Sequence, residues 1–344
     1  MTSFLNWFLL RMLNKKCFLG DKGEKNMKRI GSALLLAFFC MFLSTQVHAS
    51  EKSVRLGGFG IPVGGYSGIT SLGGNLYAVV SDGDTQAGFH LWRIEIDKQS
   101  GKLRSVVDEG FRAHPGKNAR DAEGIAYCTA RKSIFVSGEA DNAILEHRMD
   151  GTLTGRYLYL PKSVVTALCP NRGFESLTYD SVSHHFWTMN ESPLMIESHS
   201  RRLMLMQFDD SLRLSASFSY YMDEPQARNG GRDYYHGVSA MAAMEDGTLM
   251  VLEREARIAK HYQGSKCWCR LFRFNPQTGE KFLLRQWRSR FGMFNTRFAN
   301  YEGLCVGPRL QDGRQTLIML ADSQYEYGKG PWHLRDRMMV VVLE

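Results

Sequence analysis

Acidic residues recur at two kinds of position along this sequence, and both kinds lie beside short apolar segments. The first position opens such a segment, in SGIT (67–70), EGIA (123–126), ESLT (175–178), SAMA (239–242) and EGLC (302–305). The second closes a segment rich in Val, Ile, Leu and aromatic residues, in LYAVVSD, SIFVSGE, HFWTMNE, LMVLERE and TLIMLAD. Carboxylates act as general acids and bases and bind hard cations such as Ca²⁺. If the fold gathers these repeats, they predict one carboxylate-rich site.

The opening position is called the entering position here, and the other is called the closing position. The entering acids are Glu123, Glu175 and Glu302, while Ser67 and Ser239 replace the acid in the first and fourth repeats. The closing acids are Asp82, Glu139, Glu191 and Asp322, and the fourth repeat offers either Glu253 or Glu255.

Arginines stand close to the entering acids. Arg120 and Arg172 each precede an entering Glu, in NARDAEG and NRGFESL, and Arg232 lies in the equivalent loop of the next repeat. So many carboxylates around one cavity repel each other unless a cation neutralises them, and both Ca²⁺ and guanidinium groups can do so. Because guanidinium also binds phosphate in bidentate fashion, we expect an anionic, phosphorylated ligand.

These considerations assign roles to three groups of residues. We expect the catalytic residues to be Glu175, Arg172, Arg120 and Glu123. We expect the substrate-binding residues to be Arg232, His236, Ser239 and Glu253, and the metal ligands to be Glu139, Glu191, Glu302, Asp322 and Asp82.

Structural roles remain an alternative for the same residues. A repeated carboxylate can accept backbone N–H bonds from a neighbouring unit, and an Arg beside a Glu can form an ordinary salt bridge. His236 and Ser239 could form a pair for acyl transfer, but no G-x-S-x-G motif supports it.

The elements that must position these residues are β-strands. Each repeat continues into a third apolar segment, such as HLWRIEID (90–97), and the first four add another, such as LRSVVDE (103–109), with turn residues between them. The fifth repeat lacks its fourth strand, which the segment 53–59 could supply and so close the ring. The prediction is a single all-β domain, a β-propeller of five four-stranded blades, with six blades as the alternative because the unit from Ser239 to Glu302 is long.

This topology also predicts where the acids lie. In a four-stranded blade, the loop entering the innermost strand and the loop leaving the second strand are on the same face. The entering and closing acids should therefore meet at one end of the channel.

An export signal precedes the repeats. Lys28 and Arg29 are followed by an apolar run over 30–43 and a small-x-small cleavage site that ends at Ala49. The run is too short to span a bilayer, which needs about 20 residues. We expect residues 1–49 to be an N-terminal extension and a cleaved signal peptide, with translation from Met27, and residues 50–344 to be one periplasmic or secreted domain.

Composition narrows the partners. Part of the net charge of +8 belongs to the leader, so the charge does not argue for nucleic acid. We expect a monomer without a membrane span. Five cysteines follow the leader, and an odd number leaves at least one thiol outside any intramolecular disulfide. We expect these cysteines to be small buried side chains, and the pattern also allows one disulfide.

Several sequence segments resemble those of a known family. DAEGIAY, NRGFESLTYD, GVSAM with VLERE, and NYEGLCVG with LADSQ look like the phytase-like domain family, also described by its esterase-like activity of phytase. The resemblance implies an exported β-propeller that hydrolyses phosphoesters or esters, with Ca²⁺ as the metal. The expected function is metal-assisted hydrolysis at the mouth lined by carboxylates and Arg. The alternatives are a non-catalytic propeller that binds an anionic ligand or a protein partner, and a purely structural one.

Overall fold

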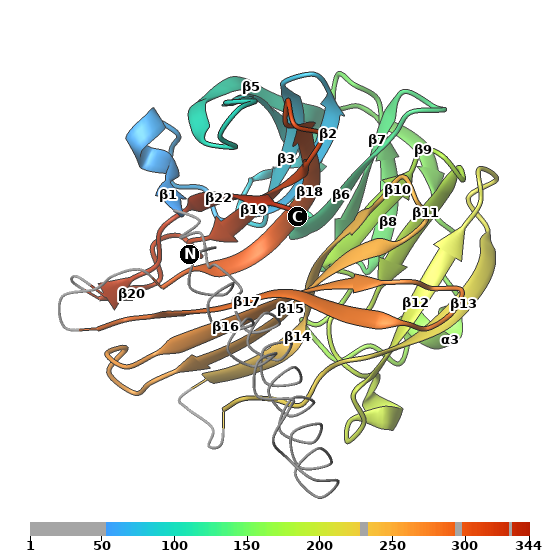
Figure 1. Cartoon of the computed structure of the whole chain (residues 1–344). Coiled ribbons are helices and arrows are strands. Elements are labelled where there is room, and N and C mark those ends of the chain that lie inside the picture. The colour runs from blue at the N-terminus through green and yellow to red at the C-terminus, as the bar shows by residue number, and fades with distance from the viewer. Residues whose placement is uncertain (1–52, 228–232, 293–297, 330–331) are drawn as a thin grey trace, which may run out of the picture. The chain divides into compact units, whose positions relative to one another are not determined.

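Five four-stranded antiparallel sheets make up the described part of the chain in a computed structural model, and Figure 1 shows them as the blades of a β-propeller. The structure describes residues 53–227, 233–292, 298–329 and 332–344. The five-bladed prediction is confirmed, and the long fourth unit forms a single sheet rather than two.

In blades 1 to 4, the strands follow one another from the innermost to the outermost. Blade 1 is β2 (Tyr66–Gly73), β3 (Leu76–Ser81), β4 (Gln86–Ile96) and β5 (Leu103–Asn118). Blade 2 is β6 (Ala122–Cys128), β7 (Ser133–Gly138), β8 (Ala143–His147) and β9 (Leu153–Tyr157), and blade 3 is β10 (Ser176–Asp180), β11 (His185–Met189), β12 (Arg202–Phe208) and β13 (Leu214–Tyr221). Blade 4 is β14 (Asp233–Ala243), β15 (Leu249–Ile258), β16 (Lys266–Phe274) and β17 (Lys281–Arg290).

Blade 5 uses both ends of the described chain. It contains β18 (Asn300–Arg309), β19 (Gln315–Asp322) and β22 (Arg337–Val342), and its outermost strand is β1 (Val54–Arg55). Val54 pairs with Met338, so the N-terminal strand closes the ring as predicted. The strand is shorter than the expected 53–59 because the chain turns into the 3₁₀ helix η1 (Leu56–Phe59) and leaves it at Gly60, in the left-handed region at φ 81°.

Short elements lie in the connections between strands, one of them between blades 2 and 3 and the others within blades 3 and 5. These are α3 (Lys162–Val165), η2 (Met195–Glu197) and the small pair β20 (Gly328–Lys329) and β21 (Trp332–His333). Each inner strand contacts the inner strands of the two neighbouring blades, in the ring order β2, β6, β10, β14, β18 and back to β2.

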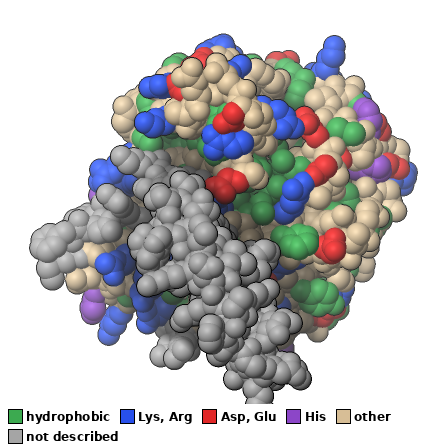
Figure 2. Space-filling model, in the orientation of Figure 1, with side chains coloured by type: hydrophobic (Ala, Val, Ile, Leu, Met, Phe, Trp, Pro, Cys, Tyr) green, Lys and Arg blue, Asp and Glu red, His purple; other side chains and the backbone are tan. Residues whose placement is uncertain are grey.

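Burial explains the strand sequences. The two faces of each second strand pack against neighbouring blades. Every residue of β19 is buried, so its sequence is apolar on both faces. The outermost strands face water on one side, and β17 accordingly alternates between exposed and less exposed residues. On the face shown in Figure 2, outside the grey atoms, Lys and Arg side chains lie among Asp and Glu side chains.

The glycine that follows several entering residues allows the inner strands to approach closely. A Cβ on Gly124 would lie 2.7 Å from the carbonyl oxygen of Glu175, and a Cβ on Gly303 would lie 3.1 Å from that of Ser67. These oxygens belong to the entering residues of the next blade. The repeated EG motif is therefore a packing requirement at the axis.

Other expectations concern the cysteines and the leader. Cys128, Cys169, Cys267, Cys269 and Cys305 are all free thiols, and all but Cys169 are buried. Among the residues that the structure describes, no helix has the length and apolar character needed to cross a membrane. The expected signal peptide and Arg232 lie outside the described residues.

Candidate active site

In four of the five blades the entering residue sits at a β-bulge of the inner strand, whereas Glu175 of blade 3 directly precedes β10. The pairing register between β18 and β19 skips Glu302, and that between β6 and β7 skips Glu123. Ser67 and Ser239 are skipped in the same way in blades 1 and 4. Because a bulge redirects a side chain out of the regular pleat, it can aim these residues away from the sheet and toward their neighbours around the axis.

The closing residues end the second strands at the same end of the channel. In blade 5, the residue two before the entering position, Asn300, pairs with Asp322. In blade 4, the residue two before the entering position is Gly237, and it pairs with Arg254. The closing position of blade 4 therefore holds Arg254 rather than Glu253 or Glu255. The name acidic mouth is used below for the entering and closing carboxylates together, which are Asp82, Glu123, Glu139, Glu175, Glu191, Glu302 and Asp322.

Arg254 binds three carboxylates, two from blade 3 and one from blade 5. Its Nη2 donates to Glu191 Oε1 at 3.0 Å and lies 3.7 Å from Glu175 Oε2, and its Nη1 donates to Glu302 Oε1 and to Asn300 Oδ1 at 2.8 Å. The side chain is only 6% exposed. Arg254 therefore neutralises part of the negative charge of the acidic mouth, because its buried positive charge attracts the acids around it.

Even with Arg254 present, acids of the mouth are short of counter-charge. Burial raises the pKa of Glu175 well above its usual value, and Glu191 raises it further although Arg254 opposes the shift. Burial raises the pKa of Glu123 in the same direction, with Glu175 and Glu302 as the next causes. Burial and mutual repulsion therefore favour the protonated forms of these two carboxyl groups.

The closing acids of blades 5 and 1 show the same effect. The pKa of Asp322 is raised well above its usual value by burial and by Glu302, and that of Asp82 is raised to about 7, again by burial first. Asp82 Oδ1 is buried and, in the described structure, has no hydrogen-bond partner. Burial also raises the pKa of Glu139, but its Oε1 accepts a hydrogen bond from Gly173 N of the next blade at 3.0 Å, which opposes the shift.

Arg172 stands at the edge of the mouth. Its Nη1 lies 3.6 Å from Glu191 Oε1, its guanidinium lies 4.9 Å from the ring centroid of Tyr235, and the side chain is 23% exposed. The predicted neighbour of the acids is thus near them and open to solvent. It can offer N–H donors to an anion.

Arg120 is placed differently. Its Nε and Nη2 bind Asp141 at 2.8 and 2.7 Å, while Nη1 donates to Val136 O at 3.2 Å and Nη2 to Ala143 O at 2.6 Å. The side chain is 4% exposed. These contacts give Arg120 a structural role inside blade 2, and its predicted catalytic role has no support from them.

Ser239 also makes a structural contact. Its hydroxyl donates to Tyr301 O at 2.9 Å, and Ser67 donates to Ala122 O at 2.6 Å. Each acceptor is the residue just before an entering acid of the next blade. At the two positions without an acid, a hydroxyl therefore links neighbouring blades.

Glu253 and His236 belong to a second cluster of charges. Glu253 accepts from the Tyr220 hydroxyl at 2.8 Å and lies 3.2 Å from Arg270, and Lys281 also donates to it. His236 Nε2 lies 3.3 Å from Arg270, and burial lowers the pKa of this imidazole. Since Glu253 is adjacent to Arg254 on a strand, their side chains point to opposite faces, so the structure separates this cluster from the acidic mouth.

The metal ligands can be tested by their grouping. Within the described residues, no three His, Cys, Asp or Glu side chains form a group that could hold a metal ion. Two closing acids do converge, because Asp82 Oδ1 and Asp322 Oδ1 both lie beside the point where a Cβ on Gly65 would stand, Asp322 Oδ1 at 3.1 Å from it. The two carboxylates offer oxygen atoms, which are the ligand type that Ca²⁺ prefers.

An apolar waist lies below the entering acids. A narrow cavity there is bounded by Glu123, Glu175 and Glu302 together with Ile69, Ile125, Leu177, Met241 and Leu304, one apolar residue from each blade. All of these apolar residues except Met241 also border a cavity of about 200 Å³ at the far end of the channel. The waist helps to keep water away from the carboxylates and so contributes to their raised pKa values.

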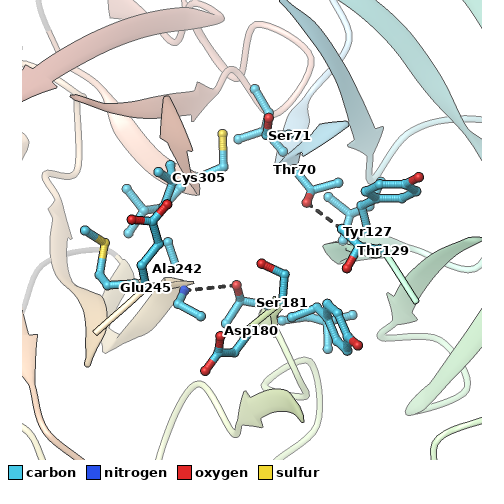
Figure 3. Close-up of a pocket in the computed structure, with 18 of the residues that line it drawn as sticks. Thr70, Ser71, Tyr127, Thr129, Asp180, Ser181, Ala242, Glu245 and Cys305 are labelled. Atoms are coloured by element: carbon cyan, nitrogen blue, oxygen red, sulfur yellow. Dashed lines mark hydrogen bonds between the residues drawn. The ribbon is translucent and has the colours of Figure 1, made fainter. Parts of the chain in front are cut away.

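The far cavity has a different character, as Figure 3 shows by the ring of side chains around its open centre. Thr70 Oγ1 accepts from Tyr127 N at 3.2 Å, one of the links between inner strands drawn there. Glu245 is paired with Arg309 at 2.6 Å. Apolar and hydroxyl side chains make up most of this lining, and its carboxylates are Asp180 and Glu245.

Comparison with protein families gives one match. The family described as phytase-like, with esterase-like activity of phytase, matches residues 61–325. The chain belongs to this family. The match spans the blades that carry every residue of the acidic mouth. No curated protein sequence matches the chain.

Solved structures with a similar chain path have low sequence identity. They include an endo-arabinase from Bacteroides thetaiotaomicron (TM-score 0.47, 11% identity, 85% of this chain and 97% of that chain). Another is an exo-β-1,3-galactanase from Phanerochaete chrysosporium (0.46, 9%, 86% and 64%), and a third is a periplasmic gluconolactonase from Pseudomonas aeruginosa (0.37, 14%, 79% and 70%). At these scores the three structures carry no argument about this chain's reaction.

Proposed function

We propose that this member of the phytase-like family is a hydrolase of phosphoesters or carboxylic esters and that the acidic mouth is its active site. The observation that carries the proposal is the convergence of Glu175, Glu191 and Glu302 on Arg254, with the pKa of Glu175 raised by burial. A group of carboxyl groups that shares protons near neutral pH can both give and take a proton, which ester hydrolysis requires.

Glu175 is the proposed proton-transfer residue. Its Oε2 is buried without a hydrogen-bond partner in the described structure, although Arg254 lies 3.7 Å away. A protonated Glu175 can donate to the leaving oxygen of an ester, while Glu123 accepts the proton of the attacking water after it has released its own proton. Both groups come from entering positions of adjacent blades, Glu123 from the bulge of β6 and Glu175 from the residue before β10, so the packed inner strands fix their positions.

Arg172 is the proposed anion-binding residue. It is the described guanidinium that is both partly exposed and within 4 Å of the mouth, through Glu191. Stacking on Tyr235 limits the conformations of its side chain. It can therefore hold the negative charge of the substrate without a large loss of conformational entropy.

Asp82 and Asp322 are proposed to bind Ca²⁺, with Glu302 as a third candidate ligand. When bound, such an ion would offset the repulsion between the carboxylates and polarise an anionic ester. The support is the pairing of the two Asp oxygens beside Gly65 and the unpartnered oxygen of Asp82.

The test is product release from phosphomonoesters, phosphodiesters and carboxylic esters by residues 50–344, with and without Ca²⁺. Arg172→Ala is compared with Arg309→Ala, because Arg309 is an exposed arginine at the far end of the channel. Turnover that Arg172→Ala reduces about tenfold or more, and that Arg309→Ala leaves unchanged, is the expected result. Absence of turnover across all ester classes, with Ca²⁺ still raising the melting temperature, would favour a binding or structural propeller instead.

A further inference from the structure

Tyr325 lies against the acidic mouth, although it follows the last closing acid in a long connection. The ideal Cβ position on Gly65 is 3.2 Å from Tyr325 Cε2 and 3.1 Å from Asp322 Oδ1, and it also touches Asp82 Oδ1. The phenol oxygen is 3.4 Å from Ser81 Oγ, next to Asp82 in the chain. One edge of the ring therefore borders the same small space as two carboxylates of the mouth.

The space for this ring depends on Gly83. A Cβ on Gly83 would overlap the phenol end of Tyr325. Gly83 does not have a positive φ, so its backbone would accept alanine. The absence of a side chain at this position thus serves the ring of Tyr325 rather than the turn.

The backbone holds Tyr325 in an unfavourable conformation. Gln324, Tyr325 and Glu326 have φ values of 42°, 52° and 58°, three successive non-glycine residues in the left-handed region. Such geometry persists where surrounding contacts impose it, and it is concentrated at ligand and active sites.

Two carboxylates impose this conformation. Asp322 Oδ1 accepts from Gln324 N at 2.6 Å. Asp336 joins the two loops on either side of the ring, since Oδ1 accepts from Ser323 N and Oδ2 from Gly64 N, each at 3.0 Å. The turn is thereby tied to the mouth itself.

Tyr325 nevertheless remains 51% exposed. A ring that is fixed by its neighbours and still open to solvent can receive the flat face of another ring at low entropic cost. We propose that Tyr325 is a ligand-positioning residue that stacks on an aromatic or sugar ring carried by the substrate and holds it beside Asp82 and Asp322. This inference rests on the proposed function and names the substrate class as ring-bearing anionic esters.

The test compares ligands with and without a ring. Binding of phenylphosphonate against methylphosphonate, and of benzoate against acetate, is measured by calorimetry with residues 50–344 and Ca²⁺ present. The same measurement is repeated for Tyr325→Ala and Gly83→Ala. Gly58→Ala is the matched control, because a Cβ there meets nothing within 4 Å. Kinetic preference for phenyl over methyl phosphate, or phenyl over methyl acetate, is measured in parallel.

The expected result is a preference for the ring compound that falls about fivefold in both Tyr325→Ala and Gly83→Ala and stays unchanged in Gly58→Ala. The intrinsic reactivity of each ester is the same for every variant, so the change in ratio isolates the ring contact. A purely structural role would lower the melting temperature without changing this ratio.

The failures of the two proposals can be told apart. Turnover with an unchanged preference in Tyr325→Ala would overturn the role of Tyr325 and leave the hydrolase intact. Ring-dependent binding that both variants weaken, without turnover of any ester, would support Tyr325 and refute the hydrolase. Absence of binding and turnover would overturn both.

Discussion

Arg254 donates a hydrogen bond of 3.0 Å to Glu191. Arg254 occupies the closing position of blade 4, whereas an acid occupies that position in each of the other four blades. The acidic mouth therefore contains its own buried counter-charge, which also reaches Glu175 and Glu302. This arrangement lets the carboxylates crowd together while leaving several with raised pKa values.

Replacing Arg254 by Met should destabilise the protein strongly. Breaking one partner out of a buried charge network costs about 3–5 kcal/mol of unfolding free energy. Because Arg254 lowers the pKa of Glu175 in the wild type, its loss raises that pKa further, and the deficit should be larger at pH 8 than at pH 5.

Urea unfolding at both pH values measures this deficit. Arg309→Ala, which breaks an exposed pair with Glu245, serves as the control and should cost less than about 1 kcal/mol. Equal stability of Arg254→Met and the wild type at pH 8 would contradict the neutralising role of Arg254.

Stability should decline as the pH rises through the range in which the mouth loses its protons. The folded pKa of Asp82 is about 7 against a usual value of 3.8, so between these values the folded state holds a proton that the unfolded state has released. The unfolding free energy then falls with pH, by at most about 1.4 kcal/mol per pH unit for one proton.

Asp82→Asn tests this sign, because an amide does not titrate. Unfolding curves at pH 4.5, 6 and 7.5 should show a shallower decline for the variant than for the wild type. A decline of identical slope would show that Asp82 is not one of the groups responsible.

How far the sequence predicts the mouth can be judged at individual positions. The entering acids Glu123, Glu175 and Glu302 were predicted to lie at one end of the channel, and they do, because strand order alone decides on which face a loop lies. Arg254 was missed because LMVLERE offers three adjacent charged residues, and only the register at the Ser239 bulge selects the one that faces the axis.

Long-range contacts account for the other differences. Arg120 and Arg172 precede their entering acids at the same distance in sequence, yet Arg120 binds Asp141 and Arg172 reaches Glu191. The partner is supplied by a different part of the chain in each case. Tyr325 gave no signal either, because its position depends on a left-handed turn and on the missing side chain of Gly83.

Ca²⁺ should raise the melting temperature in a pH-dependent way. Binding to the folded state alone stabilises it by about 2.7 kcal/mol at a concentration of 100 times Kd. Protons compete with the metal for carboxylates, so the shift should be larger at pH 8 than at pH 5.5. Asp322→Asn should remove most of it.

Glu245→Gln is the control for this experiment, since Glu245 is 75% exposed and lies at the far end of the channel. A Ca²⁺-dependent shift that survives in Asp322→Asn but not in Glu245→Gln would place the ion elsewhere.

Ser239→Ala should affect stability rather than ligand binding. The variant loses the hydrogen bond to Tyr301 O and leaves a buried carbonyl short of one donor, at a cost of about 1 kcal/mol. Denaturant unfolding measures the loss, and Ser67→Ala, which removes the equivalent link to Ala122 O, should cost a similar amount. An increase in KM without a loss of stability would instead restore Ser239 to the substrate-binding group.

The central claim is that Glu175 transfers a proton in an ester-hydrolysing mouth. The decisive measurement is kcat/KM of Glu175→Gln on the best ester, with Glu245→Gln as the matched control and with both melting temperatures recorded. The account predicts a loss of about 100-fold or more for Glu175→Gln alone, in a folded protein, since general acid–base catalysis contributes at least that much. Unchanged kcat/KM in a folded Glu175→Gln variant would contradict the claim.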